Sequence, residues 1–162
     1  MNSKDHGFEN MELYISYANL NHEVLSKPFS DYVKDEYGWT PLQFSAICYI
    51  KRNKILSMSL LADMLSITRQ QTTQLVESLC KKQLVTREQD SENRRMVYVR
   101  ATDLAVKQLI EAETTFAERV LSFINSLPED TQKKVNEAIR VMADVFAEYA
   151  ESRENIMKRN SK

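Results

Sequence analysis

The sequence predicts a mainly α-helical protein with one small antiparallel β-hairpin. Only two of its 162 residues are glycine and three are proline, whereas β-sandwiches, β-barrels and phosphate-binding loops depend on glycine. Apolar residues recur at helical spacing through most of the chain, but residues 84–88 and 95–101 alternate with a period of two. Together these observations favour a helical fold around a single hairpin.

The composition indicates one ordinary globular domain and excludes several classes of protein. Hydrophobic residues make up 43% of the chain and charged residues 28%, which is enough apolar surface to close a core without disulfides. Gly7 and Gly38 belong to no dinucleotide-binding or P-loop motif, so a nucleotide-dependent enzyme is not expected. No nucleophile with a neighbouring base is visible in the sequence, and we expect no catalytic residues.

Cysteine usage and hydropathy predict a reducing, cytoplasmic setting without a cofactor. Cys48 and Cys80 are the two cysteines, and neither lies at the spacing of a zinc site. The longest nearly apolar run, residues 44–50, is far shorter than the roughly 20 residues of a membrane helix. We therefore expect no metal, no cofactor and no membrane partner.

The N-terminal segment is expected to form one long helix with a break. Apolar residues follow a helical stripe over residues 11–33 that is interrupted near Pro28, because the proline ring removes a backbone hydrogen bond. A second helix is expected to start at Pro41, after the capping residue Thr40, and to run to about Arg52.

Two helices joined by a tight turn follow. Ser57 is placed to cap a short helix, and a tight connection is expected at residues 66–67. Thr68 and Gln71 have the spacing of a capping box, so the next helix is expected to start there and to run to about Lys82. The positions of this helix that are spaced to face the core are Thr72, Leu75, Val76 and Leu79.

A hairpin and two further helices complete the chain. Strands are expected at residues 84–88 and 95–101, around a polar turn. Helical spacing returns from Asp103, and a second capping box, Ser126–Glu129, is expected to start a last helix that runs to about Lys158. The predicted order is therefore helix, turn, helix and hairpin, flanked by longer helices.

This order, which is that of a winged helix-turn-helix, indicates DNA binding. The net charge of −1 hides a segregation of charge, because residues 68–100 carry a net charge of +3. Glutamine, arginine and threonine on the outer turns of a recognition helix can contact adenine, guanine and thymine in the major groove. Arginines at a wing tip can reach the minor groove or phosphates. The candidate DNA-binding residues are Thr68, Arg69, Gln70, Gln71, Thr73, Gln74, Arg94 and Arg95.

The terminal helices carry broad apolar stripes that predict a homodimer. The stripe of the last helix runs from Val135 to Tyr149, and no later segment is available to cover it. Large apolar stripes are rarely left exposed on a soluble monomer. We therefore divide the chain into an N-terminal dimerisation helix (1–37), a winged helix-turn-helix lobe (38–102) and C-terminal dimerisation helices (103–162), which together form one intertwined domain.

Four stretches resemble the multiple-antibiotic-resistance-regulator (MarR) family. They are WTPLQF at 39–44, LLADMLSIT at 60–68, LVESLCKKQLV at 75–85 and NRR at 93–95. The resemblance implies a homodimeric transcription regulator, usually a repressor, with intertwined first and last helices and an effector pocket between the dimer interface and the DNA-binding lobe. The implied partners are a second copy of the chain and a double-stranded DNA operator, which for a two-fold dimer is pseudo-palindromic.

Some positions depart from the family pattern. Gln83 stands where the family usually has glycine after the recognition helix, and residues 101–105 replace its usual Leu-Thr-x-x-Gly. Asn93 replaces a wing aspartate that commonly orients a neighbouring arginine. We therefore expect altered turns, and a looser wing unless Asp90 or Glu92 takes over this role.

His22 and Cys48 are the candidate effector-binding residues, for a small aromatic or amphipathic molecule. His22 lies on the first apolar stripe and could bind a carboxylate or titrate, although such a histidine is more often a hydrogen-bonded core residue. Cys48 could serve a thiol-based switch, as could Cys80, or each could be a small buried hydrophobe. The alternative functions are thus a thiol-redox-sensing regulator and a helical protein-interaction module that does not bind DNA. A merely solvated polar face is the alternative for the candidate DNA-binding residues.

Overall fold

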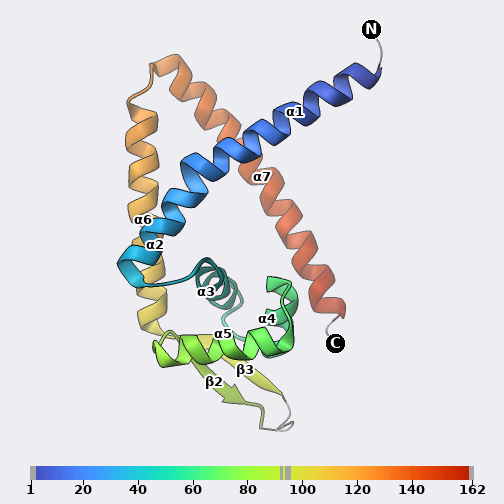
Figure 1. Cartoon of the computed structure of the whole chain (residues 1–162), viewed down its shortest axis with the longest axis vertical. Helices are drawn as coiled ribbons and strands as arrows, with labels where there is room; N and C mark the ends of the chain where they lie inside the picture. Colours follow the sequence, from blue (N-terminus) through green and yellow to red (C-terminus); the bar gives the residue numbers. More distant parts are fainter. Residues whose placement is uncertain (1–2, 92, 94–95, 161–162) are drawn as a thin grey trace. The chain divides into compact units, whose positions relative to one another are not determined.

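The computed structural model describes residues 3–91, 93 and 96–160 and is mainly helical, with one small antiparallel sheet (Figure 1). This confirms the predicted fold class. The chain divides into two units, residues 1–41 and 42–162. None of the helices in the described ranges is long and apolar enough to cross a membrane.

The first unit is a long helix that changes its winding in the middle. Helix α1 spans Ser3–Asn21, a π-helical turn follows at His22–Ser26, and α2 spans Lys27–Tyr37. The backbone N–H of Lys27 donates to the carbonyl of His22, five residues back. Proline has no N–H, and its ring clashes with the carbonyl four residues earlier, so a widened turn just before Pro28 is the expected adjustment. The predicted break in this helix is confirmed.

The second unit begins with the helix-turn-helix. Helix α3 spans Pro41–Asn53, α4 spans Met58–Leu65 and α5 spans Arg69–Lys81. Ser57 caps α4 as predicted, since its Oγ accepts the backbone N–H of Leu60 at 3.2 Å. The turn after α4 is closed by Ser66, which adopts a left-handed conformation with φ 55°.

The wing is a three-stranded antiparallel sheet, not the two-stranded hairpin that the sequence predicted. Strands β2 (Val85–Gln89) and β3 (Val97–Ala101) form the hairpin, and β1 (Leu56–Ser57) adds a short edge strand in the order β1-β3-β2. Strand β1 pairs Leu56 with Val99. Two residues are too few to show an alternating pattern, and the partner strand lies some forty positions later in the sequence. The prediction therefore missed β1.

Two long helices follow the wing. Helix α6 spans Asp103–Asn125 and α7 spans Glu129–Asn160. The predicted capping box at Ser126–Glu129 is wrong, because the Ser126 hydroxyl donates back to the Phe123 carbonyl at 2.6 Å and so closes α6. The carbonyl of Pro128 instead accepts the backbone N–H groups of Thr131 and Gln132 in the first turn of α7, each at 2.9 Å. Helix α7 also contacts α4 within this unit (Figure 1).

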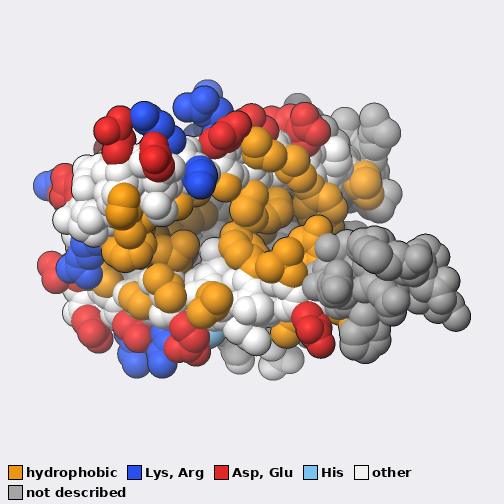
Figure 2. Space-filling model, turned by 90° about the horizontal axis from the view of Figure 1, so that it is seen from above, with side chains coloured by type: hydrophobic (Ala, Val, Ile, Leu, Met, Phe, Trp, Pro, Cys, Tyr) orange, Lys and Arg blue, Asp and Glu red, His pale blue; other side chains and the backbone are white. Residues whose placement is uncertain are grey.

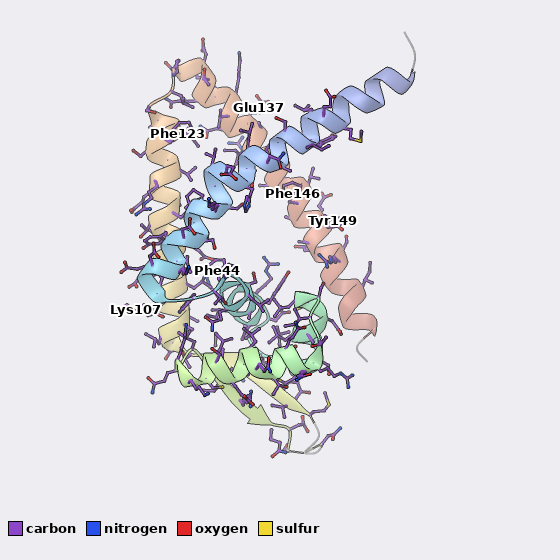
Figure 3. All side chains as sticks on the ribbon, viewed as in Figure 1. Phe44, Lys107, Phe123, Glu137, Phe146 and Tyr149 are labelled. Carbon is purple, nitrogen blue, oxygen red and sulfur yellow. The ribbon has the colours of Figure 1, made fainter. Side chains whose placement is uncertain are left out.

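Apolar side chains are distributed unevenly among the helices. In the helix-turn-helix, the wing and the start of α6 they are buried, including Ile47, Ile50, Leu61, Val76, Leu79, Val99 and Leu109. Helices α1 and α7 instead expose large apolar side chains, and hydrophobic groups gather at the surface in Figure 2. Phe146 and Tyr149 of α7, labelled in Figure 3, are 59% and 69% exposed.

Candidate nucleic-acid interface

Helix α5 separates a buried face from a polar outer face, as predicted. Its buried residues are Thr72, Leu75, Val76 and Leu79. Its exposed N-terminal residues are Arg69, Gln70, Gln71, Thr73 and Gln74. The helix is therefore anchored on one side and presents hydrogen-bonding groups and one positive charge on the other.

The start of α5 is fixed by a complete capping box. The backbone N–H of Gln71 donates to Thr68 Oγ1 at 3.2 Å, and Gln71 Oε1 accepts the backbone N–H of Thr68 at 2.9 Å. The Thr68 hydroxyl also donates to Gln71 Oε1, at 3.0 Å. A bidentate contact to adenine needs both the oxygen and the amino group of glutamine. In this arrangement the oxygen of Gln71 already serves the cap.

The neighbouring residues on the outer face make fewer hydrogen bonds within the protein than Gln71 does. Within the described part of the chain, the side chains of Gln70 and Gln74 make no hydrogen bond, so both amide groups are available. The Thr73 hydroxyl donates to the backbone carbonyl of Arg69 at 3.0 Å, which leaves its methyl group and its oxygen lone pairs for other contacts. Gln70 and Gln74 are thus better placed than Gln71 to read a base.

Arg87 joins this surface and was not among the predicted residues. It lies on β2, and its Nη2 donates to the backbone carbonyl of Thr73 in α5 at 3.2 Å. Arg87 pairs in register with Val99, whereas its neighbour Glu88 pairs with Tyr98 on the opposite face of the sheet. Arg87 shares a face of β2 with the buried Val85, and the packing of α5 against β2 brings it to the Thr73 carbonyl. The sequence of β2 alone does not reveal this contact with α5.

A cavity of about 400 Å³ opens between the start of α4, the first turns of α5 and the wing. It is lined by Ser57, Met58, Ser59, Arg69, Thr73, Arg87, Met96 and Val97. The described part of the lining combines two guanidinium groups and three hydroxyl groups with apolar side chains. Such a surface suits a ligand with an anionic group beside an apolar one.

The predicted wing-tip arginines, Arg94 and Arg95, lie outside the described residues. Two hydrogen bonds join the described residues on either side of them: the Asp90 carboxylate accepts the backbone N–H of Asn93 at 2.7 Å, and the backbone N–H of Met96 donates to the carbonyl of Asn93 at 2.8 Å. Asp90 therefore shapes the turn in which Asn93 departs from the family pattern.

The end of α5 is also held in place. Gln43, buried in α3, donates from Nε2 to Ser78 Oγ at 2.9 Å and accepts from Lys82 Nζ at 3.1 Å. Gln83 then adopts a left-handed conformation, φ 59°, at the position where the family usually has glycine. Its carbonyl accepts the Thr102 hydroxyl at 2.8 Å. Gln83 thus adopts the backbone conformation that glycine favours, although it carries a side chain.

The two candidate effector residues lie in different units. His22 is exposed in the single chain, at the start of the π-helical turn. Cys48 is partly buried in α3, and burial, followed by the negative charge of Glu113, raises the pKa of its thiol to about 11. In the described residues no group of three or more His, Cys, Asp or Glu side chains could hold a metal ion.

Helix, turn, helix and a β-wing, in this order and with this packing, define the winged helix class of proteins. Comparison with known proteins makes the class more specific, since residues 37–96 match the model of the MarR family. The predicted resemblance to MarR-family transcription regulators is confirmed. No curated protein matches the sequence.

Solved structures share the fold over most of the chain. The transcriptional regulator BldR from Sulfolobus solfataricus is 24% identical with a TM-score of 0.63, covering 91% of this chain and 99% of its own. A mutant of MepR from S. aureus, bound to an oligodeoxyribonucleotide, is 17% identical with a TM-score of 0.66, covering 83% and 97%. A mutant of MarR from E. coli is 16% identical with a TM-score of 0.64, covering 82% and 95%. At these identities the likeness shows a common fold.

Proposed function

We propose that this chain is a sequence-specific DNA-binding transcription regulator in which α5 enters the major groove. The observation that carries the proposal is the outer face of α5, which is polar, exposed and fixed at its start by the Thr68 capping box. A preformed helix with free amide side chains loses little conformational entropy when it contacts bases. The MepR mutant of the same fold, which is bound to an oligodeoxyribonucleotide, supports this use of the fold.

The chemistry of the exposed side chains suggests what α5 reads. Gln70 and Gln74 can each offer an acceptor and a donor to adenine. Gln71 stabilises the helix start, so its contribution is structural. We therefore expect half-sites rich in A·T pairs, with Gln74 contributing more to discrimination than Gln71.

A second copy of the chain is the proposed partner for the terminal helices. Helix α1 exposes Leu13, Tyr14 and Ile15, and α7 exposes Phe146 and Tyr149. An isologous dimer would bury such faces and relate two recognition helices by a two-fold axis. The operator is then a pseudo-palindrome with half-site centres about one helical turn, roughly 10 base pairs, apart.

The proposed regulation is repression relieved by a small aromatic or amphipathic effector. In one form of the dimer the two DNA-binding lobes are spaced so that they do not fit DNA. An effector that prefers this form lowers the affinity of the protein for its operator. The operator then lowers the affinity for the effector by the same factor. A titration of bound effector that is unaffected by saturating operator would contradict this regulation while leaving DNA binding intact. We assign no catalytic role and no cofactor to the chain.

Two alternatives lead to different results. A thiol-redox sensor needs a reactive thiolate, and the raised pKa of Cys48 makes that cysteine a poor candidate. Loss of DNA binding with peroxide and its recovery with a reductant would nevertheless favour the sensor. A protein-interaction module without DNA affinity would fail to bind duplex DNA at all.

Electrophoretic mobility with DNA from the promoter region of its own gene tests the proposal most directly. A shuffled duplex of the same length and composition serves as the control. We expect the natural duplex to bind at least tenfold more tightly, and a footprint to protect two related half-sites. Equal affinity for both duplexes, or a footprint on a single asymmetric site, would contradict sequence-specific binding by a dimer.

A further inference from the structure

The cavity between α4, α5 and the wing has a charge pattern that the recognition helix alone does not explain. Arg69 and Arg87 both line it, and among the described residues of the lining there is no aspartate or glutamate. Within the ranges that the structure describes, neither guanidinium forms an ion pair. Two positive groups that face one cavity without a carboxylate favour an anionic ligand.

A neighbouring arginine outside the cavity, Arg100, does have an acidic partner. Arg100 lies on β3, pairs in register with Thr86, and forms an ion pair with Glu88 at 3.2 Å. Alternation along the strands places Arg100 and Glu88 on one face of the sheet and Arg87 on the other. The wing therefore neutralises the arginine on one face and leaves the one that lines the cavity unpaired.

Arg87 is also held in position for a ligand. Its Nη2 donates to the Thr73 carbonyl at 3.2 Å, which ties the guanidinium to the first turns of α5. A guanidinium carries five N–H donors in a planar arrangement. One contact to a carbonyl fixes its orientation and leaves further donors for a bidentate contact to a phosphate group.

The apolar part of the lining makes the ligand more specific. Met58, Met96 and Val97 line the same cavity as the two arginines. A DNA strand alternates an anionic phosphate with an apolar deoxyribose, and half or more of the hydrogen bonds in protein–DNA complexes go to this backbone. A single sugar–phosphate unit therefore matches both parts of the lining.

From this geometry we infer that the cavity receives one sugar–phosphate unit of the DNA strand that passes between α5 and the wing, with its phosphate on Arg87 and Arg69. The inference rests on the proposed function, and it adds Arg87 to the interface. Strand β2 then contributes to DNA affinity independently of the wing tip. Because a phosphate carries no sequence information, this contact strengthens binding to all duplexes equally.

Salt dependence of DNA binding tests the inference. Arg87→Gln should weaken binding to natural and shuffled duplexes by the same factor. It should also make the log–log salt slope of the dimer shallower by about two units, since each of the two half-sites loses one phosphate contact and each contact contributes about 0.9. Arg100→Gln removes the same charge from the opposite face of the wing and is the matched control, with an unchanged slope expected. Arg87→Lys should restore most of the slope, because the charge is kept.

A chemical change in the DNA locates the contact. Neutral methylphosphonates are introduced one at a time along each strand, and at one position per half-site the substitution should weaken binding of the parent protein but not of the Arg87→Gln variant. Additive losses at every position would mean that Arg87 contacts no particular phosphate and would overturn the inference. Circular dichroism of each variant shows whether its helices are intact, and Arg87→Lys supplies the test if Arg87→Gln fails to fold.

Two further results separate this inference from the proposed function. If Gln74→Ala loses discrimination between duplexes while Arg87→Gln keeps the parental salt slope, the cavity is not a phosphate site but α5 still reads DNA. If free deoxyribose 5-phosphate binds the parent with a micromolar Kd that depends on Arg87, without competing with DNA, the cavity belongs to a free ligand and the inference is wrong. If the parent does not bind duplex DNA, both proposals fail.

Discussion

Leu79 of α5 and Phe146 of α7 are both large apolar side chains on amphipathic helices, but their surroundings differ. Leu79 is fully buried, whereas Phe146 is 59% exposed, and Tyr14 of α1 is 70% exposed. Burial of apolar area contributes about 25 cal/mol per Å² wherever the covering surface comes from. The helix-turn-helix lobe obtains that cover within the chain. In the proposed dimer, the apolar faces of α1 and α7 obtain it from a second copy of the chain.

This difference implies that the two regions respond to mutation in different ways. A change in the lobe core should alter the free energy of unfolding and leave the mass of the assembly unchanged. A change on the exposed face of α7 should alter the mass of the assembly first. Each of the following predictions tests one side of this contrast, beginning with the largest expected effect.

Phe146→Asp should dissociate the dimer. It removes an apolar side chain from the proposed interface and places a charge there, for a loss of about 3–5 kcal/mol of association free energy. Light scattering at micromolar concentration should then give the mass of one chain, 18.9 kDa, where the parent gives twice that value. Glu137→Gln, an exposed position of the same helix outside the apolar stripe, is the control. A parent that is already monomeric would contradict the contrast between the regions.

Leu79→Ala should destabilise the lobe without dissociating the dimer. Truncation of a fully buried leucine costs about 2–5 kcal/mol, because apolar contacts are lost and a cavity remains. Urea unfolding at fixed protein concentration measures the change, and light scattering in the absence of urea should still give the dimer mass. A cost below about 1 kcal/mol would show that the core around α5 is less tightly packed than its burial indicates.

The sequence predicted well those features that depend on neighbouring residues. The caps made by Ser57 and Thr68 and the buried positions of α5 follow from spacings of three or four residues, and each is confirmed. Ser126 shows the limit of this reasoning, because a serine between two helices can serve either one. Its hydroxyl bonds to Phe123 behind it, so a capping pattern with Glu129 misplaced the cap.

Features that depend on distant residues were missed. Strand β1 exists because Leu56 pairs with Val99. Arg87 lines the cavity because α5 packs against β2 and its Thr73 carbonyl accepts from Arg87. Such pairings leave no local pattern in the chain. The candidate site was thus predictable along α5 and not across the junction of α5 with the wing.

Gln74→Ala and Gln71→Ala should separate base reading from helix capping within the lobe. Gln74→Ala removes an uncommitted amide, so discrimination between natural and mutated operators should fall by about 1–3 kcal/mol if the contact is bidentate. Gln71→Ala removes the acceptor for the Thr68 N–H, so it should lower thermal stability more than it lowers discrimination. Binding assays with both duplexes and thermal melts measure the two effects. Equal losses of discrimination would mean that Gln71 leaves the cap when DNA binds.

Gln83→Gly should stabilise the lobe, by the smallest amount in this series. A residue with a Cβ pays about 1 kcal/mol in the left-handed conformation, whereas glycine does not. Gln83 has φ 59°, and the hydrogen bond that it accepts from Thr102 uses its backbone carbonyl, so the substitution keeps that bond. Glycine also increases the entropy of the unfolded chain, which reduces the net gain to about 0.5 kcal/mol.

Gly38 allows the reverse of the Gln83→Gly substitution, from glycine to a residue with a Cβ atom. It ends α2 with φ 65°, so Gly38→Ala should destabilise the protein by about 1 kcal/mol for the same steric reason. Opposite shifts in thermal midpoint for Gln83→Gly and Gly38→Ala would show that backbone conformation controls stability at both turns. If Gln83→Gly lowers the midpoint, the glutamine side chain makes contacts that outweigh its strain. The departure from glycine at this turn would then be a source of stability for the lobe, because the side chain would tie the end of α5 to its surroundings.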